Sequence, residues 1–195
     1  MTMLGSASQA TAAVAATGAR ARPSIGALWN ALAVVPDPEI PVISVIELGI
    51  LRGIRWDTVD STTLVVTVTP TYSGCPATEL IATLLQEALA AAGVAKVRVE
   101  FELSPAWTTD WMTVEAKRKL RDFGIAPPDG LRAVSAPAAI DVAGISPLRR
   151  SSVVVPCPRC GSVQTRLLSQ FGSTACKAQY RCLDCAEPFD YFKPH

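Results

Sequence analysis

The sequence predicts an α+β fold in two parts, a small layered domain followed by a C-terminal zinc-ribbon-like domain. Residues 25–123 alternate between segments with helical periodicity and segments with the two-residue period of strands. Two C-x2-C pairs follow near the C-terminus, after a proline-rich stretch. The expected organisation is a disordered extension, a layered domain, a linker and a four-cysteine domain, at residues 1–22, 23–125, 126–150 and 151–195.

Composition narrows the class of protein. The chain has 195 residues, with 18 Lys plus Arg against 17 Asp plus Glu, and this near-neutral balance argues against nucleic acid as a partner. Apolar residues make up 49% of the chain, which is enough for a packed core. The Ala-rich first residues are too weakly apolar for a membrane span and lack the basic start of a secretory signal. We therefore expect a cytoplasmic protein without a membrane partner.

The layered domain is expected to contain three helices and three strands. The helical period predicts helices over residues 25–35, 76–92 and 113–124, and the second carries an apolar stripe of Leu80, Leu84, Leu85 and Leu89. Apolar and β-branched runs predict strands over residues 49–56, 64–70 and 95–103. The first two of these strands should form a hairpin.

A loop and a cysteine in this domain point to chemistry. The segment DPEIPV and the residue before it contain three prolines, which exclude a helix. The loop is therefore extended and displays Asp37 and Glu39. Cys75 directly precedes Pro76 and should lie at the positive end of the helix over residues 76–92, where its pKa falls. A half-buried structural cysteine is an equal alternative. If the fold brings the loop beside Cys75, the mixed ligands suit transient iron better than permanent zinc.

The strongest motif is the spacing of four cysteines in the C-terminal domain. Two thiolates separated by two residues can reach one ion from a tight turn, and a second such turn completes a tetrahedron around Zn²⁺. We expect strands at TRLLSQF and AQYRC to join the two turns. Disulfides, free thiols and an iron-sulfur cluster are the alternatives that the spacing leaves open. The expected zinc ligands are Cys157, Cys160, Cys182 and Cys185.

The remaining candidates argue against an enzyme. Cys176 is a fifth C-terminal thiol, either a buried small residue or a spare ligand or redox thiol that Lys177 makes a thiolate. The single histidine is the terminal His195, so a Cys–His catalytic pair is not expected. Phosphate-binding, zinc-protease and dinucleotide motifs are absent from the sequence. Trp107 and Trp111 are interpreted as core or partner-contact residues.

Five segments carry a resemblance to a known family: DPEIPVISVIELGI, VTVTPTYSGCP, CPRCGS, FGSTACKAQYRC and CAEPFDYFK. Over residues 24–195 the chain resembles the PaaD family, the small accessory subunits of the phenylacetyl-CoA epoxidase of aerobic phenylacetate catabolism. Residues 24–123 are similar to the broader iron-sulfur assembly domain shared with SufT. The DPE loop and the Cys-Pro at a helix start are the signature of that domain.

The resemblance implies a non-catalytic accessory role in the epoxidase system. This role is the maturation or metal loading of one of two clients, an oxygenase with a di-iron centre or a reductase with an iron-sulfur cluster. It assigns Asp37, Glu39 and Cys75 as functional residues, with Cys75 as a ligand of transient iron or cluster. Zn²⁺ is the expected structural metal of the ribbon, with Cys176 as an extra ligand candidate. The implied partners are the oxygenase and reductase subunits, and the residues leave a homo-oligomer open. The alternatives are a structural subunit of the oxygenase and a zinc-ribbon module that recognises protein or nucleic acid.

Overall fold

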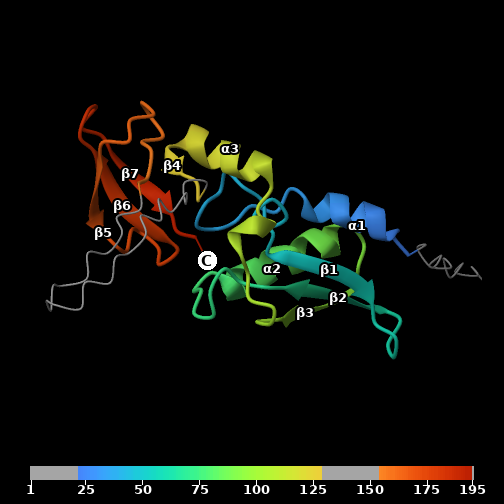
Figure 1. Ribbon diagram of the computed structural model, residues 1–195. Helices are drawn as coiled ribbons and strands as arrows, with labels where there is room; N and C mark the ends of the chain where they lie inside the picture. The colour runs from blue at the N-terminus through green and yellow to red at the C-terminus, as the bar shows by residue number, and fades with distance from the viewer. Residues whose placement is uncertain (1–21, 129–153, 195) are drawn as a thin grey trace, which may run out of the picture.

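The computed structural model describes residues 22–128 and 154–194. Almost all of the expected extension, most of the expected linker over residues 126–150, and His195 lie outside the described residues. Figure 1 shows two neighbouring lobes, a layered domain coloured blue to yellow and a β-ribbon domain coloured orange to red. The predicted α+β class is confirmed.

Helices and strands follow one another in the predicted order through the first domain. None of the described helices is long and apolar enough to cross a bilayer. The elements are α1 Ile25–Leu32, β1 Leu51–Trp56, β2 Thr63–Val68, α2 Thr78–Ala91, β3 Lys96–Phe101, the short 3-10 turn η1 Thr109–Trp111, α3 Val114–Phe123, β4 Ile125–Ala126, β5 Thr165–Ser169, β6 Lys177–Cys182 and β7 Pro188–Phe192.

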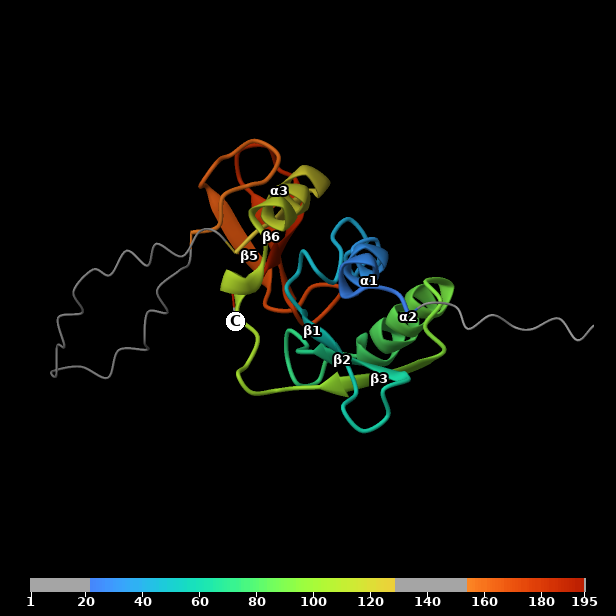
Figure 2. The ribbon, with the colours of Figure 1, turned by 90° about the vertical axis from the view of Figure 1, so that its right-hand side faces the viewer.

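The first domain is built on a three-stranded sheet in the order β1-β2-β3. The predicted hairpin is confirmed, because β1 and β2 pair antiparallel. β3 then pairs parallel with β2, which requires the crossover that α2 provides. Figure 2 shows α1 and α2 on the same side of this sheet. The core between sheet and helices includes Leu28, Leu32, Leu64, Val66, Val68, Leu85 and Leu89.

Two details of the predicted helices are corrected. α1 ends at Leu32 rather than at residue 35, and its N-terminus is capped by Ser24, whose hydroxyl accepts from the amide of Ala27 at 3.2 Å. In α2 the buried stripe runs through Ile81, while Leu80 is 51% exposed. The stripe is therefore set by Ile81, Leu85 and Leu89, which share one face at helical spacing.

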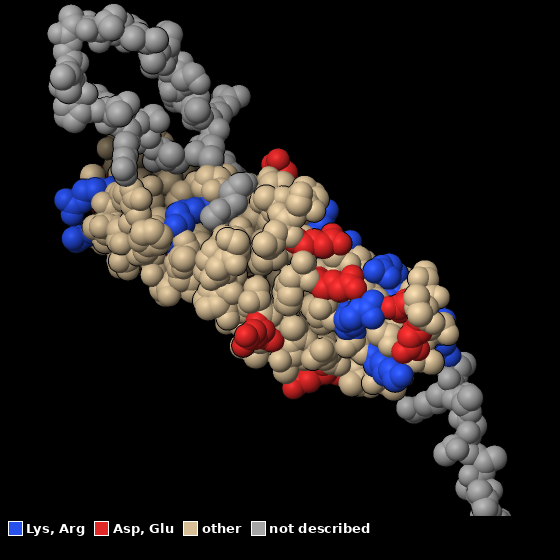
Figure 3. Space-filling model, turned by 90° about the horizontal axis from the view of Figure 1, so that it is seen from below, with Lys and Arg blue, Asp and Glu red and all other residues tan. Residues whose placement is uncertain are grey.

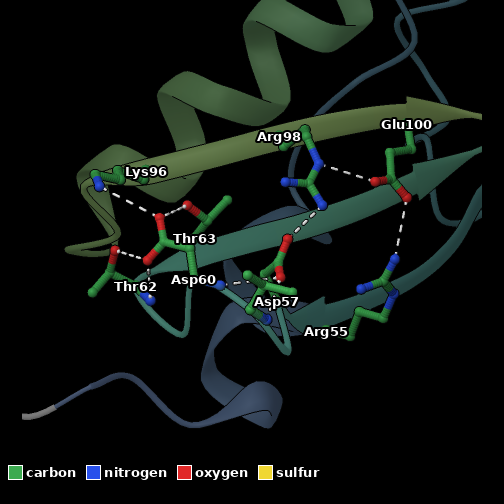
Figure 4. Close-up of polar contacts among 9 residues, drawn as sticks. Arg55, Asp57, Asp60, Thr62, Thr63, Lys96, Arg98 and Glu100 are labelled. Atoms are coloured by element: carbon green, nitrogen blue, oxygen red, sulfur yellow. Dashed lines mark hydrogen bonds and ion pairs between the residues drawn. The ribbon is translucent and has the colours of Figure 1, made fainter.

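Polar contacts fix the outer end of the sheet (Figure 4). Asp57 accepts from the backbone amide of Val59 at 2.7 Å, and its carboxylate pairs with Arg98 of β3 at 2.5 Å. Lys96 reaches Asp60 at 3.4 Å in the same turn. Figure 3 shows acidic and basic side chains intermixed over this end of the molecule. Exposed pairs contribute little free energy, and the register of β3 is set by its backbone pairing with β2.

The second domain is a four-stranded sheet in the order β4-β7-β6-β5. β5 and β6 match the predicted ribbon strands, whereas β4 and β7 were not predicted. β7 has the sequence PFDYF, and it pairs antiparallel with β6 and parallel with β4. Because β4 directly follows α3, the first domain supplies an edge strand to the ribbon.

Apolar contacts also join the two domains. The Trp107 ring is 3% exposed and meets Phe192 of β7 edge-on, with ring centroids 6.0 Å apart. Its indole N–H donates to the carbonyl of Leu48 at 3.1 Å, which satisfies the buried polar group. Phe192 and Cys176 belong to the hydrophobic core of the first domain. Of the two uses expected for Trp107, core or partner contact, the structure shows the core, and this packing holds one end of the ribbon against the layered domain.

Candidate metal centre and interdomain thiol cluster

The four predicted zinc ligands come together at one end of the ribbon. Cys157 and Cys160 lie in the turn before β5, whereas Cys182 ends β6 and Cys185 lies in the turn that follows. Their sulfur atoms all lie within 4.8 Å of one another. The Cys157–Cys185 and Cys160–Cys182 sulfurs are 3.8 Å and 3.6 Å apart.

These separations fit one tetrahedral ion. Four sulfurs at about 2.3 Å from a single zinc ion lie about 3.8 Å from one another. A disulfide would bring two sulfurs to about 2.05 Å, and all six cysteines are free. In a cluster of several irons the thiolates bind different metal atoms, so they would be spread farther apart. The donor set and its spacing therefore match a single ion with four thiolate ligands.

The backbone of both turns supports this arrangement. The residue after the second cysteine of each pair, Gly161 and Ala186, has a left-handed backbone with φ of 76° and 64°. This conformation turns the chain sharply enough for two cysteines to face one point, and it is costly for Ala186. The amide of Cys185 also points at the sulfur of Cys182, at 3.5 Å. The two turns are thus equivalent metal knuckles.

Cys176 lies far from these knuckles, contrary to the expectation of an extra ligand there. It precedes the first residue of β6, while Cys182 is the last. Six residues of extended chain place the Cα atoms of Cys176 and Cys182 about 20 Å apart. The thiol of Cys176 instead faces the first domain, where its sulfur lies 3.8 Å from the carboxylate of Glu39.

The DPE loop presents Glu39 to the ribbon. Asp37 is 6% exposed, and its carboxylate accepts from the amides of Glu39 and Ile40 at 2.9 Å and 2.8 Å. Burial raises the pKa of Asp37, although these two amides and Lys177 oppose the rise. Asp37 therefore shapes the loop, and this leaves Glu39 as the carboxylate that reaches the second domain. Burial and the neighbouring Asp37 raise the pKa of Glu39 as well.

Cys75 comes from a third segment of the chain, and it packs against the hydrophobic core that contains Cys176. It lies just before α2, where its carbonyl accepts from the hydroxyl of Thr78 at 2.9 Å, and its thiol is half-buried. Burial raises its pKa, and the charges of Glu39 and Asp37 raise it further. The amides of Ala77 and Thr78 favour the thiolate but do not outweigh these effects. The expected fall in the pKa of Cys75 is therefore wrong, because the helix end is buried beside two carboxylates.

Lys177 does not make Cys176 a thiolate. Burial raises the pKa of Cys176 to about 11, and Glu39 and Asp37 add to the rise. The Lys177 ammonium is itself buried and pairs with Asp190 of β7 at 3.1 Å. The hydroxyl of Thr174 lies 3.0 Å from the Cys176 sulfur. Lys177 lowers the pKa of Cys176, but burial and the two carboxylates outweigh it, so the thiolate expected from this neighbour is not favoured.

One residue of this region was missed in the sequence. The pKa of Tyr72 is raised to about 12, first by burial and then by the nearby charges of Cys75, Glu39 and Cys176. Tyr72 is therefore close enough for all three groups to raise the pKa of its hydroxyl, and its carbonyl accepts from the amide of Cys75 at 3.2 Å. Nothing in the segment TPTYSGCP marks this tyrosine, because its neighbours come from distant parts of the chain. We call Asp37, Glu39, Cys75 and Cys176 the interdomain cluster, with Tyr72 at its side.

A cavity opens next to the interdomain cluster at the domain junction. Its volume is about 290 Å³, and its wall includes Glu39, Gly124, Lys177 and Asp190. Glu39 therefore faces both the thiol of Cys176 and an open space, so an ion can approach it from solvent.

Both domains of the chain match known protein families. Residues 26–101 match the family described as iron-sulfur cluster assembly protein, and residues 144–193 match the PaaD zinc beta ribbon domain. The chain is 47% identical over 178 residues to an Escherichia coli protein named as a subunit of 1,2-phenylacetyl-CoA epoxidase, covering 89% of this chain and 94% of that protein. The chain belongs to the PaaD family. The resemblance seen in the sequence is confirmed.

Three solved structures are also similar to this PaaD-family chain. A DUF59 domain from Bacillus anthracis is 26% identical, covering 49% of this chain and 90% of that one, with a TM-score of 0.45. The Thermotoga maritima protein TM0487 is 31% identical, covering 51% and 95%, with a TM-score of 0.43. Rv1466 from Mycobacterium tuberculosis, described as associated with iron-sulfur complex assembly and repair, is 27% identical, covering 55% and 93%, with a TM-score of 0.33.

The two family matches divide the candidate site residues of this PaaD member. The iron-sulfur assembly match contains Asp37, Glu39 and Cys75, and the zinc ribbon match contains Cys176 with the four knuckle cysteines. The interdomain cluster therefore draws on both matched regions.

Proposed function

We propose that this chain is a non-catalytic accessory protein that loads iron, as a single ion or a cluster, into the phenylacetyl-CoA epoxidase system. The proposal is supported by its family and by the match of its first domain to iron-sulfur cluster assembly proteins. The observation that carries it is that Cys75 packs, half-buried, against the core of the domain whose DPE loop holds Asp37 and Glu39, close enough for these carboxylates to raise the pKa of its thiol. In this account the client is the oxygenase or the reductase, and the work is done in the cytoplasm.

The interdomain cluster has the chemistry of a temporary holder. A cysteine sulfur is a soft ligand and a carboxylate oxygen is a hard one, and Fe²⁺ accepts both. Burial and mutual charge raise the pKa values of Cys75, Glu39 and Asp37, so a cation must compete with protons for these groups more strongly than it would for the same groups in water. Binding must displace those protons, which weakens it and favours later release.

The ribbon has a different part in this proposal. Its four thiolates fit a resident Zn²⁺, which would be held by Cys157, Cys160, Cys182 and Cys185. Zinc has no redox chemistry, and it would supply folding free energy to a domain whose described part is too small for a large core of its own. The zinc would stabilise the sheet that carries Cys176.

The test compares two variants in cells that make the epoxidase. With Cys75→Ser we expect a folded chain with normal zinc but an epoxidase poor in iron and low in activity. The matched control is Ser73→Ala, an exposed change in the same loop, which should leave the iron content unchanged. Full iron loading of the epoxidase with Cys75→Ser would refute the proposal.

A structural subunit of the oxygenase is the second candidate, because the Escherichia coli relative is named as a subunit. A structural subunit would purify with active epoxidase in a fixed ratio, and its removal from the finished complex would abolish activity. A maturation factor would be absent from the active complex. Measuring the composition of purified active epoxidase separates the two.

A further inference from the structure

We propose that Cys176 of the ribbon is a ligand of the metal-holding site in the first domain, which it forms together with Glu39 and Cys75. The site takes a divalent, borderline-soft cation such as Fe²⁺. The inference rests on the proposed function in taking Cys75 as a ligand, and it adds that the zinc ribbon contributes a thiol to that site.

The distance between Cys176 and Glu39 already fits a shared ion. A carboxylate oxygen at about 2.1 Å and a thiolate sulfur at about 2.3 Å from one tetrahedral ion lie about 3.6 Å apart. The Glu39 oxygen and the Cys176 sulfur are 3.8 Å apart in the structure. Both groups are held by their surroundings, Glu39 by the Asp37-centred loop and Cys176 by its burial in the core of the first domain.

Cys75 stands as the third ligand from another element. Cys75 and Tyr72 both pack against the hydrophobic core that contains Cys176, and the amide of Cys75 donates to the carbonyl of Tyr72 at 3.2 Å. Among the described residues, only the ribbon knuckles form a group of three or more ligands within 4.8 Å of one another. The interdomain cluster is therefore more open than the zinc site, which suits an ion that must leave again.

The charge of the cluster calls for a cation. Two thiols and two carboxyl groups meet there, and the neighbouring Lys177 already pairs with Asp190 at 3.1 Å. A divalent ion would bind these groups as thiolates and carboxylates, and the thiol protons would pass to solvent. The mixture of sulfur and oxygen ligands favours Fe²⁺ or Co²⁺ over Mg²⁺ or Ca²⁺. The cavity beside Glu39 gives such an ion a route from solvent.

The position of Cys176 also makes the site depend on the ribbon. The amide of Lys193 donates to the carbonyl of Cys176 at 2.9 Å, next to Phe192, which packs against Trp107. The same contacts that hold the ribbon on the first domain therefore hold the Cys176 thiol opposite Glu39.

The experiment is an anaerobic titration of the zinc-loaded full-length chain with Co²⁺, whose visible and near-ultraviolet spectrum reports tetrahedral thiolate ligands. Zinc in the protein is counted at each step, so that exchange in the ribbon is recognised. We expect one Co²⁺ to bind while the zinc stays. Cys176→Ser, Cys75→Ser and Glu39→Gln should each weaken this binding at least tenfold, and the first two should also lower the sulfur-to-cobalt absorption. Glu79→Gln, an exposed change on α2, is the matched control and should have no effect.

Three results would overturn the inference. The first is an unchanged Co²⁺ titration in Cys176→Ser. The second is the loss of zinc from folded Cys176→Ser, which would make Cys176 a ligand of the ribbon zinc. The third is a wild-type chain that retains its zinc and binds no Co²⁺. Loss of Co²⁺ binding in Cys75→Ser but not in Cys176→Ser would leave the proposed function standing and reject only the role of Cys176. The proposed function itself fails on a separate reading, the iron content of the epoxidase.

Discussion

The carboxylate of Glu39 lies 3.8 Å from the sulfur of Cys176, across 137 positions of sequence and a domain boundary. Glu39 belongs to the loop that marks the first domain, and Cys176 to the ribbon that marks the PaaD family. The two motifs therefore meet in one place. The ribbon is therefore a neighbour of the DPE loop.

Removing one zinc ligand should unfold the ribbon and disturb the domain junction. We expect Cys182→Ser to lose the metal, because three thiolates leave the tetrahedron incomplete and structural zinc supplies much of the folding free energy of small domains. Elemental analysis should show loss of zinc, and limited proteolysis should cut the ribbon. Leu183→Ala, an adjacent exposed change, should retain both zinc and protection. Retained zinc in Cys182→Ser would contradict the four-ligand site.

The contact between Trp107 and Phe192 should contribute strongly to stability. Trp107→Ala removes a ring that is 3% exposed and leaves a cavity at the junction, so the free energy of unfolding should fall by about 3–5 kcal/mol. Urea unfolding followed by circular dichroism measures this change. Trp107→Phe keeps a ring beside Phe192 but loses the hydrogen bond to Leu48, and a smaller loss is expected. Equal losses in both variants would show that the ring contact is unimportant.

Gly49 should tolerate no side chain. Its φ is +78°, and a Cβ there would lie 2.4 Å from the carbonyl oxygen of Trp111. Gly49→Ala should therefore destabilise the protein by about 2 kcal/mol or more, since strain and overlap add. Gly26→Ala is the contrasting change, because an added Cβ in α1 meets nothing within 4 Å. It should stabilise the helix by about 0.5 kcal/mol, and thermal unfolding should separate the two in opposite directions.

Glu47 should make stability depend on acid pH. Burial alone would raise its pKa, but Lys119 at 2.6 Å and the amide of Ser44 at 2.9 Å outweigh burial and lower it. A carboxyl whose pKa is lower in the folded state stabilises above its unfolded pKa, about 4.3, and loses that effect as the pH falls through the folded value. Glu47→Gln should cost about 1 kcal/mol at pH 7 and progressively less below about pH 4. Urea unfolding across this range checks it, and Glu87→Gln, on the exposed side of α2, should give parallel curves with the wild type.

Local patterns were enough to predict much of this fold. The repeat of Leu85 and Leu89 predicts α2, and the alternation of Val and Thr before Pro70 predicts β2, because each depends on neighbours in the sequence. The C-x2-C pairs predict the metal knuckles because two ligands from one turn leave little freedom in where the ion lies. These elements were found where they were expected.

Other features depend on contacts between distant segments. β4 has two residues and exists only because β7 lies beside it. The pKa of Cys75 depends on Asp37 and Glu39, nearly forty residues earlier, and on its burial. Cys176 appears in the sequence as a fifth thiol of the ribbon, and only the packing of Phe192 against Trp107 brings it to the first domain. Such placements require the assembled tertiary structure.

Transfer of radiolabelled iron tests whether this chain carries iron at Cys75 for delivery to the epoxidase system. The chain, loaded anaerobically with labelled Fe²⁺, is mixed with iron-free oxygenase and with iron-free reductase, and the label in each is counted after separation. We expect label to pass from the wild-type chain to one of these clients, and we expect Cys75→Ser to transfer little. Equal transfer by the wild-type chain, Cys75→Ser and free Fe²⁺ would contradict this role.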